Sequence, residues 1–246
     1  MSVTNPEAGT RPGAETADTD EERRALAERA ARELEGAPAR EVIAWAAEAF
    51  GDRLCMTSSM ADALMVDLVS AVVPGIDVIF LDTGYHFAET IGTRDAVAAM
   101  YPINLINVEP QRTVAEQDRD LGPRLHGRNP SICCHLRKVE PLKRALEPYD
   151  AWLSGLRRDE ASTRRNIPVV QWDRRRRMVK VNPIAGWTQD DVDAYMAEHG
   201  VLVNPLQYDG YPSIGCAPCT RRVEEGEDPR SGRWAGFAKT ECGIHL

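Results

Sequence analysis

Cysteines in two pairs mark the part of this sequence where we expect chemistry. Cys133 and Cys134 are adjacent, and Cys216 and Cys219 are separated by two residues. Zinc ions and iron–sulfur clusters both accept four cysteine thiolates. Adjacent side chains diverge, so such a pair fits poorly around one small ion and better around a cluster whose metal corners lie apart. The pattern therefore favours one [4Fe–4S] cluster over zinc.

The two remaining cysteines have different settings. Cys55 lies in an apolar run, where we expect a buried thiol that acts as a small hydrophobic side chain. Cys242 lies four residues from the last residue and has no paired cysteine, and terminal segments are often weakly ordered. We expect a reactive thiol on a mobile arm, with Gly243 allowing bending and His245 orienting a ligand or favouring the thiolate. Taken alone, a lone cysteine in such a segment is more often a free thiol of no consequence.

The residues around the first cysteine pair predict a helix that begins at about Ser131. Cys133 and Cys134 then fall in its first turn, where backbone N–H groups and the helix dipole favour thiolates. Lys138 follows Cys134 by four residues, on the same helical face, within reach of the thiolates or of an anion beside them. From spacing alone, a solvated surface lysine is an equally good interpretation of Lys138.

Three motifs of the sequence resemble a known enzyme family. They are C-C-x-x-R-K-x-x-P-L from Cys133, G-C-x-P-C-T-R from Gly215, and E-C-G-I-H from Glu241. Together they resemble the assimilatory adenylylsulfate (APS) reductases, the cluster-bearing branch of the APS/PAPS reductase family, from about Trp45 onward. The resemblance implies thioredoxin-dependent reduction of APS to sulfite and AMP in sulfate assimilation and cysteine biosynthesis, through an S-sulfocysteine on Cys242.

Alternating strand and helix patterns predict an α/β fold. Apolar runs at 53–57, 76–81, 103–108 and 151–155 are typical of buried strands, and helical segments separate them. This order predicts a mostly parallel, twisted sheet with helices on both faces. The resemblance implies the adenine-nucleotide alpha-hydrolase-like variant of this class, with a flexible C-terminal arm.

Composition bounds the domain organisation and the partners. We expect a disordered tail at 1–19, one α/β domain with the iron–sulfur site at 20–229, and a catalytic arm at 230–246. A net charge of −8 argues against general nucleic-acid binding, and no apolar run approaches the ~18 residues of a membrane span. No secretory signal is evident, so we expect a reducing, cytoplasmic setting, where disulfides are disfavoured. A homo-oligomer is compatible with the sequence.

The ends of the first two strands predict where an anionic ligand binds. Ser58 and Ser59 link a strand to a helix that we expect from about Ala61 to Val73. Backbone N–H groups bind anions at such a place, although an ordinary helix cap has the same sequence. The glycines and lysine of a Walker A loop are missing. Asp82, Thr83 and Gly84 end the second strand, and the resemblance assigns them to the nucleotide side of the substrate site.

An arginine-rich loop at 156–165 follows the fourth strand and is a candidate phosphate clamp. The resemblance makes Arg164 the substrate-binding arginine, with Arg165 as the alternative. By contrast, the run Arg174–Arg177 lies in a polar break between two apolar segments, which predicts a hairpin tip with solvated arginines.

Two further arginines precede the terminal cysteine. The resemblance places Arg230 and Arg233 at the sulfate and phosphate of the substrate, beside Cys242. Without it, surface ion pairs with the nearby acidic residues would be the better interpretation. These acidic residues are Glu225, Glu227 and Asp228.

The resemblance combines these residues into one reaction. The Cys242 thiolate attacks the sulfuryl sulfur of APS and expels AMP, while surrounding cations neutralise the anionic oxygens. A dithiol, taken from thioredoxin in the family, then releases sulfite. The expected substrate-binding groups near the sulfur are Lys138, Arg164, Arg230, Arg233 and His245. A PAPS reductase, and a zinc-stapled nucleotide-binding module without catalysis, are the alternatives.

Overall fold

The computed structural model describes residues 19–245, so the expected tail lies outside the described residues except for Thr19. Thr19 caps α1 (Asp20–Glu33) in a reciprocal capping box with Glu22. Helix α2 (Ala39–Phe50) follows and buries one apolar face against the core. The capping motif thus marks the start of the first described helix.

Six strands form one twisted sheet in the order β3-β2-β1-β4-β6-β5. All neighbouring strands run parallel except β5 and β6, which form an antiparallel hairpin at one edge. The predicted mostly parallel sheet is confirmed. The strands are β1 (Leu54–Thr57), β2 (Ile76–Leu81), β3 (Ile103–Val108), β4 (Ala151–Leu153), β5 (Val170–Asp173) and β6 (Met178–Val181).

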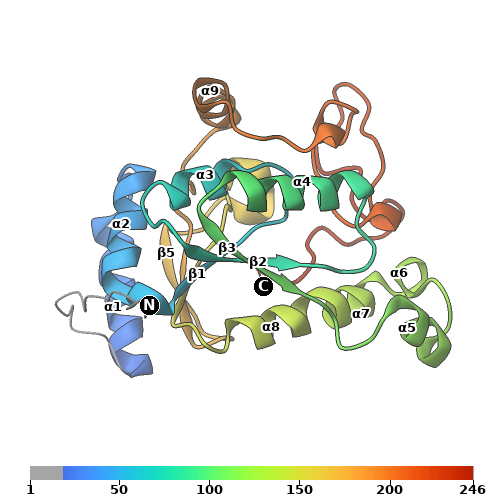
Figure 1. The fold of residues 1–246 in the computed structure, drawn as a ribbon, viewed down its shortest axis with the longest axis horizontal. Helices are drawn as coiled ribbons and strands as arrows, with labels where there is room; N and C mark the ends of the chain where they lie inside the picture. The colour runs from blue at the N-terminus through green and yellow to red at the C-terminus, as the bar shows by residue number, and fades with distance from the viewer. Residues whose placement is uncertain (1–18, 246) are drawn as a thin grey trace, which may run out of the picture.

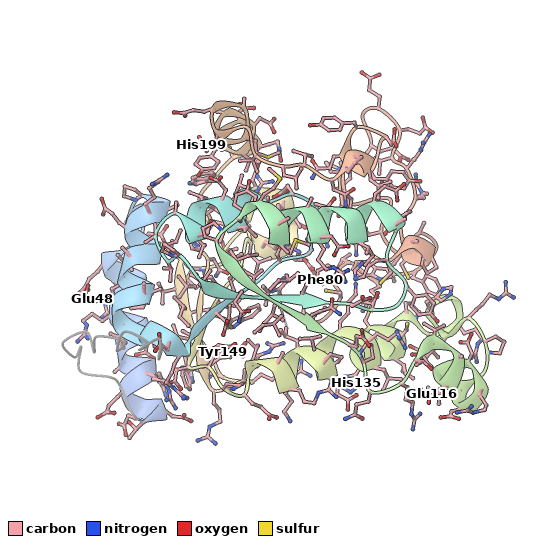
Figure 2. The ribbon with its side chains drawn as sticks, in the orientation of Figure 1. Glu48, Phe80, Glu116, His135, Tyr149 and His199 are labelled. Atoms are coloured by element: carbon pink, nitrogen blue, oxygen red, sulfur yellow. The ribbon has the colours of Figure 1, made fainter. Side chains whose placement is uncertain are left out.

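Helices cover both faces of the sheet, as predicted (Figure 1). Helices α3 (Leu64–Ser70) and α4 (Ala88–Met100) lie above the strands in this view, and α8 (Glu140–Leu146) lies below them. Figure 2 shows Phe80 of β2 in the layer next to α4, where it belongs to the larger apolar core. A smaller apolar cluster on the α8 side contains Cys55, which is fully buried, as expected for a structural cysteine.

The other helices lie mostly around the cysteine-rich end of the sheet. They are α5 (Val114–Leu121), α6 (Leu125–Arg128), α7 (Pro130–Cys134) and α9 (Gln189–His199). A π-helical segment, His135–Val139, joins α7 to α8, and such segments are frequent at functional sites. Within residues 19–245, no helix is both long enough and apolar enough to cross a membrane.

Two local predictions were wrong. The helix expected from about Ala61 begins only at Leu64, because Met60 adopts a left-handed conformation and Asp62 pairs with Val203. The arginines of the β5–β6 hairpin are not all solvated. The Asp173 carboxylate accepts hydrogen bonds from the turn backbone and from Arg176 at 2.8 Å, which folds the Arg176 side chain inward to 7% exposure.

Candidate active site

A cavity of about 340 Å³ lies at the carboxyl ends of β1, β2 and β4. Thr57 and Ser58 line it at the end of β1, Leu81 at the end of β2, and Ser154 and Gly155 after β4. Open parallel sheets bind ligands at this edge. The cavity is therefore the candidate substrate site.

The last described residues form one wall of this cavity. Glu241, Cys242, Ile244 and His245 all line it, and Cys242 is half-buried. The C-terminus lies between β2 and α8 in Figure 1, inside the outline of the sheet and helices. The structure thus brings the predicted nucleophile to the ligand-binding edge of the sheet.

Most of the predicted substrate-binding residues lie around the same space. Arg164 is buried and Arg165 is exposed, so the structure places Arg164 of this pair at the cavity. The predicted site residues that line the cavity are Ser58, Ser59, Lys138, Arg164, Arg230, Arg233, Cys242 and His245.

The loop after β2 has a different position. Asp82, Thr83 and Gly84 do not line the cavity, and Asp82 pairs with Arg94 instead. The buried Thr83 hydroxyl lies 3.3 Å from the Cys216 sulfur. Gly84 has φ +70°, and a Cβ there would lie 3.1 Å from Arg137 Nη2, so the loop approaches this arginine as closely as a glycine allows.

Arg230 and Arg233 do not form the surface ion pairs that the sequence left open. The Arg230 guanidinium donates to the Thr240 carbonyl at 2.9 Å and to Glu241 at 3.3 Å. Arg233 donates to Ser213 and to the Ile214 carbonyl, and burial lowers its pKa although the Cys242 thiol acts in the opposite direction. Both arginines face the terminal segment that carries the cysteine.

The four paired cysteines line one small internal cavity. Cys133 and Cys134 come from α7, which is capped by Asn129 and begins at Pro130, one residue before the predicted start. Cys216 and Cys219 flank a 3-10 turn, which is held by a hydrogen bond from Ala217 N–H to the Tyr85 carbonyl and by one from Trp234 N–H to the Cys219 carbonyl. Two segments far apart in sequence therefore present their sulfurs to one place.

The donor set of this small cavity fits an anionic iron–sulfur centre. Burial, followed by the neighbouring cysteines, raises the pKa of Cys133 to about 12 and that of Cys219 to about 11, so the four thiolates need positive charge beside them. Among the described residues, no Asp or Glu lines the cavity. Arg137 lines it and is buried, with only carbonyl and amide oxygens as its acceptors.

The spacing of the cysteines bears on the kind of centre they could hold. Cys133 and Cys134 are adjacent, so their side chains diverge and fit poorly around one small ion. A cluster with several metal corners, spaced for an adjacent cysteine pair, matches the donor set better.

Lys138 lies between the two cavities and lines both. Burial is the largest single effect and lowers the pKa of Lys138. The negative charge of the nearby sulfurs, chiefly Cys216 and Cys242, together outweighs it, so the pKa lies above its usual value. The lysine therefore stays protonated. It is half-buried, which departs from the solvated surface lysine that spacing alone allowed. One cation thus faces both the paired cysteines and the terminal cysteine.

Acidic side chains of the cavity were missed by the sequence analysis. The Glu241 carboxylate accepts two hydrogen bonds from Arg164, at 2.8 and 2.9 Å, and Glu160 also pairs with Arg164. Burial raises the pKa of Glu241, but its hydrogen bond from Arg164 and the nearby arginines outweigh this, so the pKa lies below the usual range. The only signal for this contact was the place of Glu241 in the E-C-G-I-H motif.

Comparisons with known proteins agree with the geometry. Residues 53–222 match the phosphoadenosine phosphosulfate reductase domain. The chain is 63% identical to the adenosine 5'-phosphosulfate reductase of Streptomyces coelicolor, over 92% of this chain and 96% of that protein. It is 57% identical to the protein of the same name from Mycolicibacterium smegmatis, over 94% and 98% of the two chains.

Solved structures show the same architecture. The phosphate complex of the PAPS reductase of Candida auris superposes with a TM-score of 0.68 at 28% identity, covering 80% of this chain and 96% of that one. An FMN adenylyltransferase of Candida glabrata in complex with ATP has a TM-score of 0.55 at 10% identity, covering 93% and 78%. The second likeness concerns the fold alone, and it agrees with the expected adenine-nucleotide alpha-hydrolase-like class.

Proposed function

This chain belongs to the phosphoadenosine phosphosulfate reductase family, and on that premise we propose that it is an oxidoreductase that reduces APS to sulfite and AMP in sulfate assimilation. One observation carries the proposal beyond the similarity. Cys242, which lies outside both cysteine pairs, lines the ligand cavity together with several cations. These cations are Lys138, Arg164, Arg230 and Arg233.

In the first step, the thiolate of Cys242 attacks the sulfuryl sulfur of APS. The S–O bond to the nucleotide phosphate breaks, AMP leaves with the bonding electron pair, and Cys242 becomes an S-sulfocysteine. The surrounding cations compensate the charge on the sulfuryl and phosphoryl oxygens, where preformed charges contribute most in a site that excludes water. Lys138 supports the thiolate as well, because its ammonium group interacts with the Cys242 sulfur.

In the second step, an external dithiol such as thioredoxin completes the reduction. Its thiolate attacks the Cys242 sulfur and expels sulfite, and its second thiol resolves the mixed disulfide, which regenerates the free cysteine. The dithiol supplies the two electrons that convert the sulfuryl sulfur into sulfite. For this step the segment at 230–246 must present Cys242 to another protein, as expected of a catalytic arm.

On the nucleotide side, Ser58 and Ser59 offer hydroxyl and backbone groups at the end of β1, where they would bind a phosphate oxygen. Ser154 and Gly155 line the same space and would face the nucleoside. Asp82, Thr83 and Gly84 would support this side only indirectly, because Thr83 contacts Cys216, Gly84 approaches Arg137 and Asp82 pairs with Arg94.

Cys133, Cys134, Cys216 and Cys219 would hold a [4Fe–4S] cluster. When bound, it would supply a fixed negative charge and a structural link between α7 and the 3-10 turn at Cys216. Lys138 would then lie between this charge and the substrate oxygens, in a position to respond to both.

The experiment that tests the proposed chemistry isolates the first step. Incubating the protein with APS and no reductant should add the mass of one sulfonate to the C-terminal peptide, and thioredoxin should then release sulfite. Cys242→Ser should keep its iron and bind AMP, yet form no adduct. An adduct on another cysteine, or wild-type sulfite release by Cys242→Ser, would show that the mechanism is wrong.

PAPS reduction is the second candidate, since the Candida auris structure is named as a PAPS reductase. Near-full-length similarity to proteins named as APS reductases favours APS. Comparing kcat/KM for APS and PAPS, with thioredoxin as reductant, decides between them. We expect a clear preference for APS, and an equal or reversed preference would overturn the assignment.

A further inference from the structure

The terminal segment is held on both sides of Cys242, by two different sets of residues. On the N-terminal side, the Glu241 carboxylate is bound by Arg164 and Arg230. These arginines line the cavity and are assigned above to substrate. On the C-terminal side, the residues that hold the segment come from β4 and the β5–β6 hairpin, and the proposed reaction does not use them.

On that side, the β5–β6 hairpin reaches the last two described residues. Arg176 Nη2 donates a hydrogen bond to the Ile244 carbonyl at 2.8 Å, and Lys180 Nζ lies 3.1 Å from His245 Nδ1. The Ile244 side chain packs on the smaller apolar cluster on the α8 side of the sheet. A backbone contact, a side-chain contact and an apolar contact thus fix two consecutive residues.

Trp152 of β4 organises these contacts. It is fully buried, and the His245 ring stacks on it with a centroid distance of 5.7 Å and an interplanar angle of 5°. The Lys180 ammonium lies 4.9 Å from the indole centroid, and the Arg176 guanidinium lies 5.7 Å from it. Cations and aromatic rings both favour the face of an indole ring. The single Trp152 side chain therefore contacts His245, Lys180 and Arg176.

Lys180 is an unusual residue for the interior of a strand. It is 1% exposed, and in the part of the chain that the structure describes, its one recorded hydrogen-bond partner is His245. A lysine of this kind is costly to bury unless its ammonium or amine group has a specific partner. The His245 ring nitrogen and the Trp152 ring supply such partners, and the first of them belongs to the terminal segment.

We infer that Trp152, Arg176 and Lys180 form a terminal seat, which receives Ile244 and His245 and thereby positions the Cys242 sulfur at the ligand cavity. Gly243 is the single residue between the nucleophile and the seated pair, and its φ of +89° forms the turn that joins them. Arg176 and Lys180 are positioning residues for the sulfur-transfer step. The inference rests on the proposed role of Cys242.

The test compares Arg176→Gln and Lys180→Met with Arg174→Gln, an exposed arginine of the same hairpin. In iron-loaded protein, iodoacetamide should alkylate Cys242 about five- to tenfold faster in the first two variants, the change that loss of one buried hydrogen bond predicts. Peptide mapping locates the label. Arg174→Gln should react at the wild-type rate.

A kinetic measurement separates positioning from a merely structural role. With APS and no reductant, the single-turnover rate of sulfonate transfer to Cys242 should fall by a similar factor in the two seat variants, while the Kd for AMP stays within twofold. Folded variants with unchanged alkylation and transfer rates would overturn the inference. If the wild type forms no sulfonate adduct, the proposed function fails, whereas the alkylation rates still report on the seat.

Discussion

The carboxylate of Glu241 lies against the guanidinium of Arg164, with two hydrogen bonds of 2.8 and 2.9 Å. The same carboxylate accepts a hydrogen bond from Arg230 at 3.3 Å. Two cations proposed for the substrate oxygens are thus paired with the residue that directly precedes the nucleophile. Substrate binding and docking of the terminal segment therefore draw on the same positive charges.

Replacing Glu241 with Gln should separate these two uses. In a Cys242→Ser background, Glu241→Gln should bind AMP roughly fivefold more tightly, because a charged competitor for Arg164 and Arg230 is removed. With Cys242 present, kcat should fall, since the segment has lost its charged contact. Calorimetry and steady-state kinetics measure the two effects. The exposed Glu225→Gln is the control, and weaker AMP binding by Glu241→Gln would contradict the competition.

Gly215 controls the position of Arg233. A Cβ at Gly215 would overlap the Arg233 guanidinium, so Gly215→Ala must displace it. We expect a loss of about tenfold in kcat/KM for APS, as for a misplaced charged hydrogen bond, with iron content preserved. Gly186→Ala is the matched control, because a Cβ there meets nothing within 4 Å. Wild-type kinetics in Gly215→Ala would show that Arg233 does not contribute to the reaction with APS.

Lys180 should give stability a specific pH dependence. Burial lowers its pKa to about 7, an effect that Asp173 partly opposes and Arg176 and Arg164 reinforce, whereas the unfolded chain titrates near pH ~10.4. Between these values the unfolded chain binds more protons, so the free energy of unfolding contributed by Lys180 rises with pH, by up to roughly 1 kcal/mol per pH unit.

Urea denaturation of the wild type and Lys180→Met checks this dependence. The variant lacks the buried ammonium, so its stability advantage should be largest near pH 7 and should shrink towards pH 10. Taking the difference between the two proteins cancels the other titrating groups to first order. A pH-independent difference would mean that Lys180 stays charged over the whole range in the folded protein.

Each paired cysteine should be required for iron. Single Ser variants of Cys133, Cys134, Cys216 and Cys219 should lose iron and sulfide and unfold at lower temperature, because metal binding is coupled to folding of the site. Cys55→Ala is the control and should keep both, since Cys55 lies in the core away from the cavity. Normal iron in any one Ser variant would remove that cysteine from the ligand set.

Local patterns predicted the elements of this fold well. The apolar runs predicted as strands correspond to β1, β2, β3 and β4 of the sheet. These features depend on near neighbours in sequence, so the sequence alone identifies them. The start of α3 was missed because the pairing of Asp62 with Val203 comes from a distant segment.

The residues of the candidate site also fall into two groups, those identified by sequence motifs and those placed by contacts between distant segments. Motifs identified Lys138, Arg164 and Cys242, which the fold brings to one cavity. Arg176 was predicted to be solvated and Lys180 was not considered, because a hairpin tip and a strand carry no signal for a contact with the end of the chain. Such contacts depend on the strand order β4-β6-β5.

The central place of β1 in the sheet has a kinetic consequence. Arg53, directly before β1, pairs with Asp150, directly before β4, across 97 residues of chain. Parallel pairing over such a separation must close a long loop first, which makes folding slow. One cysteine pair precedes β4 and the other follows β6, so pairing of these strands helps to bring the two cysteine pairs together. Refolding of the iron-free chain should therefore be limited by formation of the sheet, at a rate that added iron and sulfide leave unchanged.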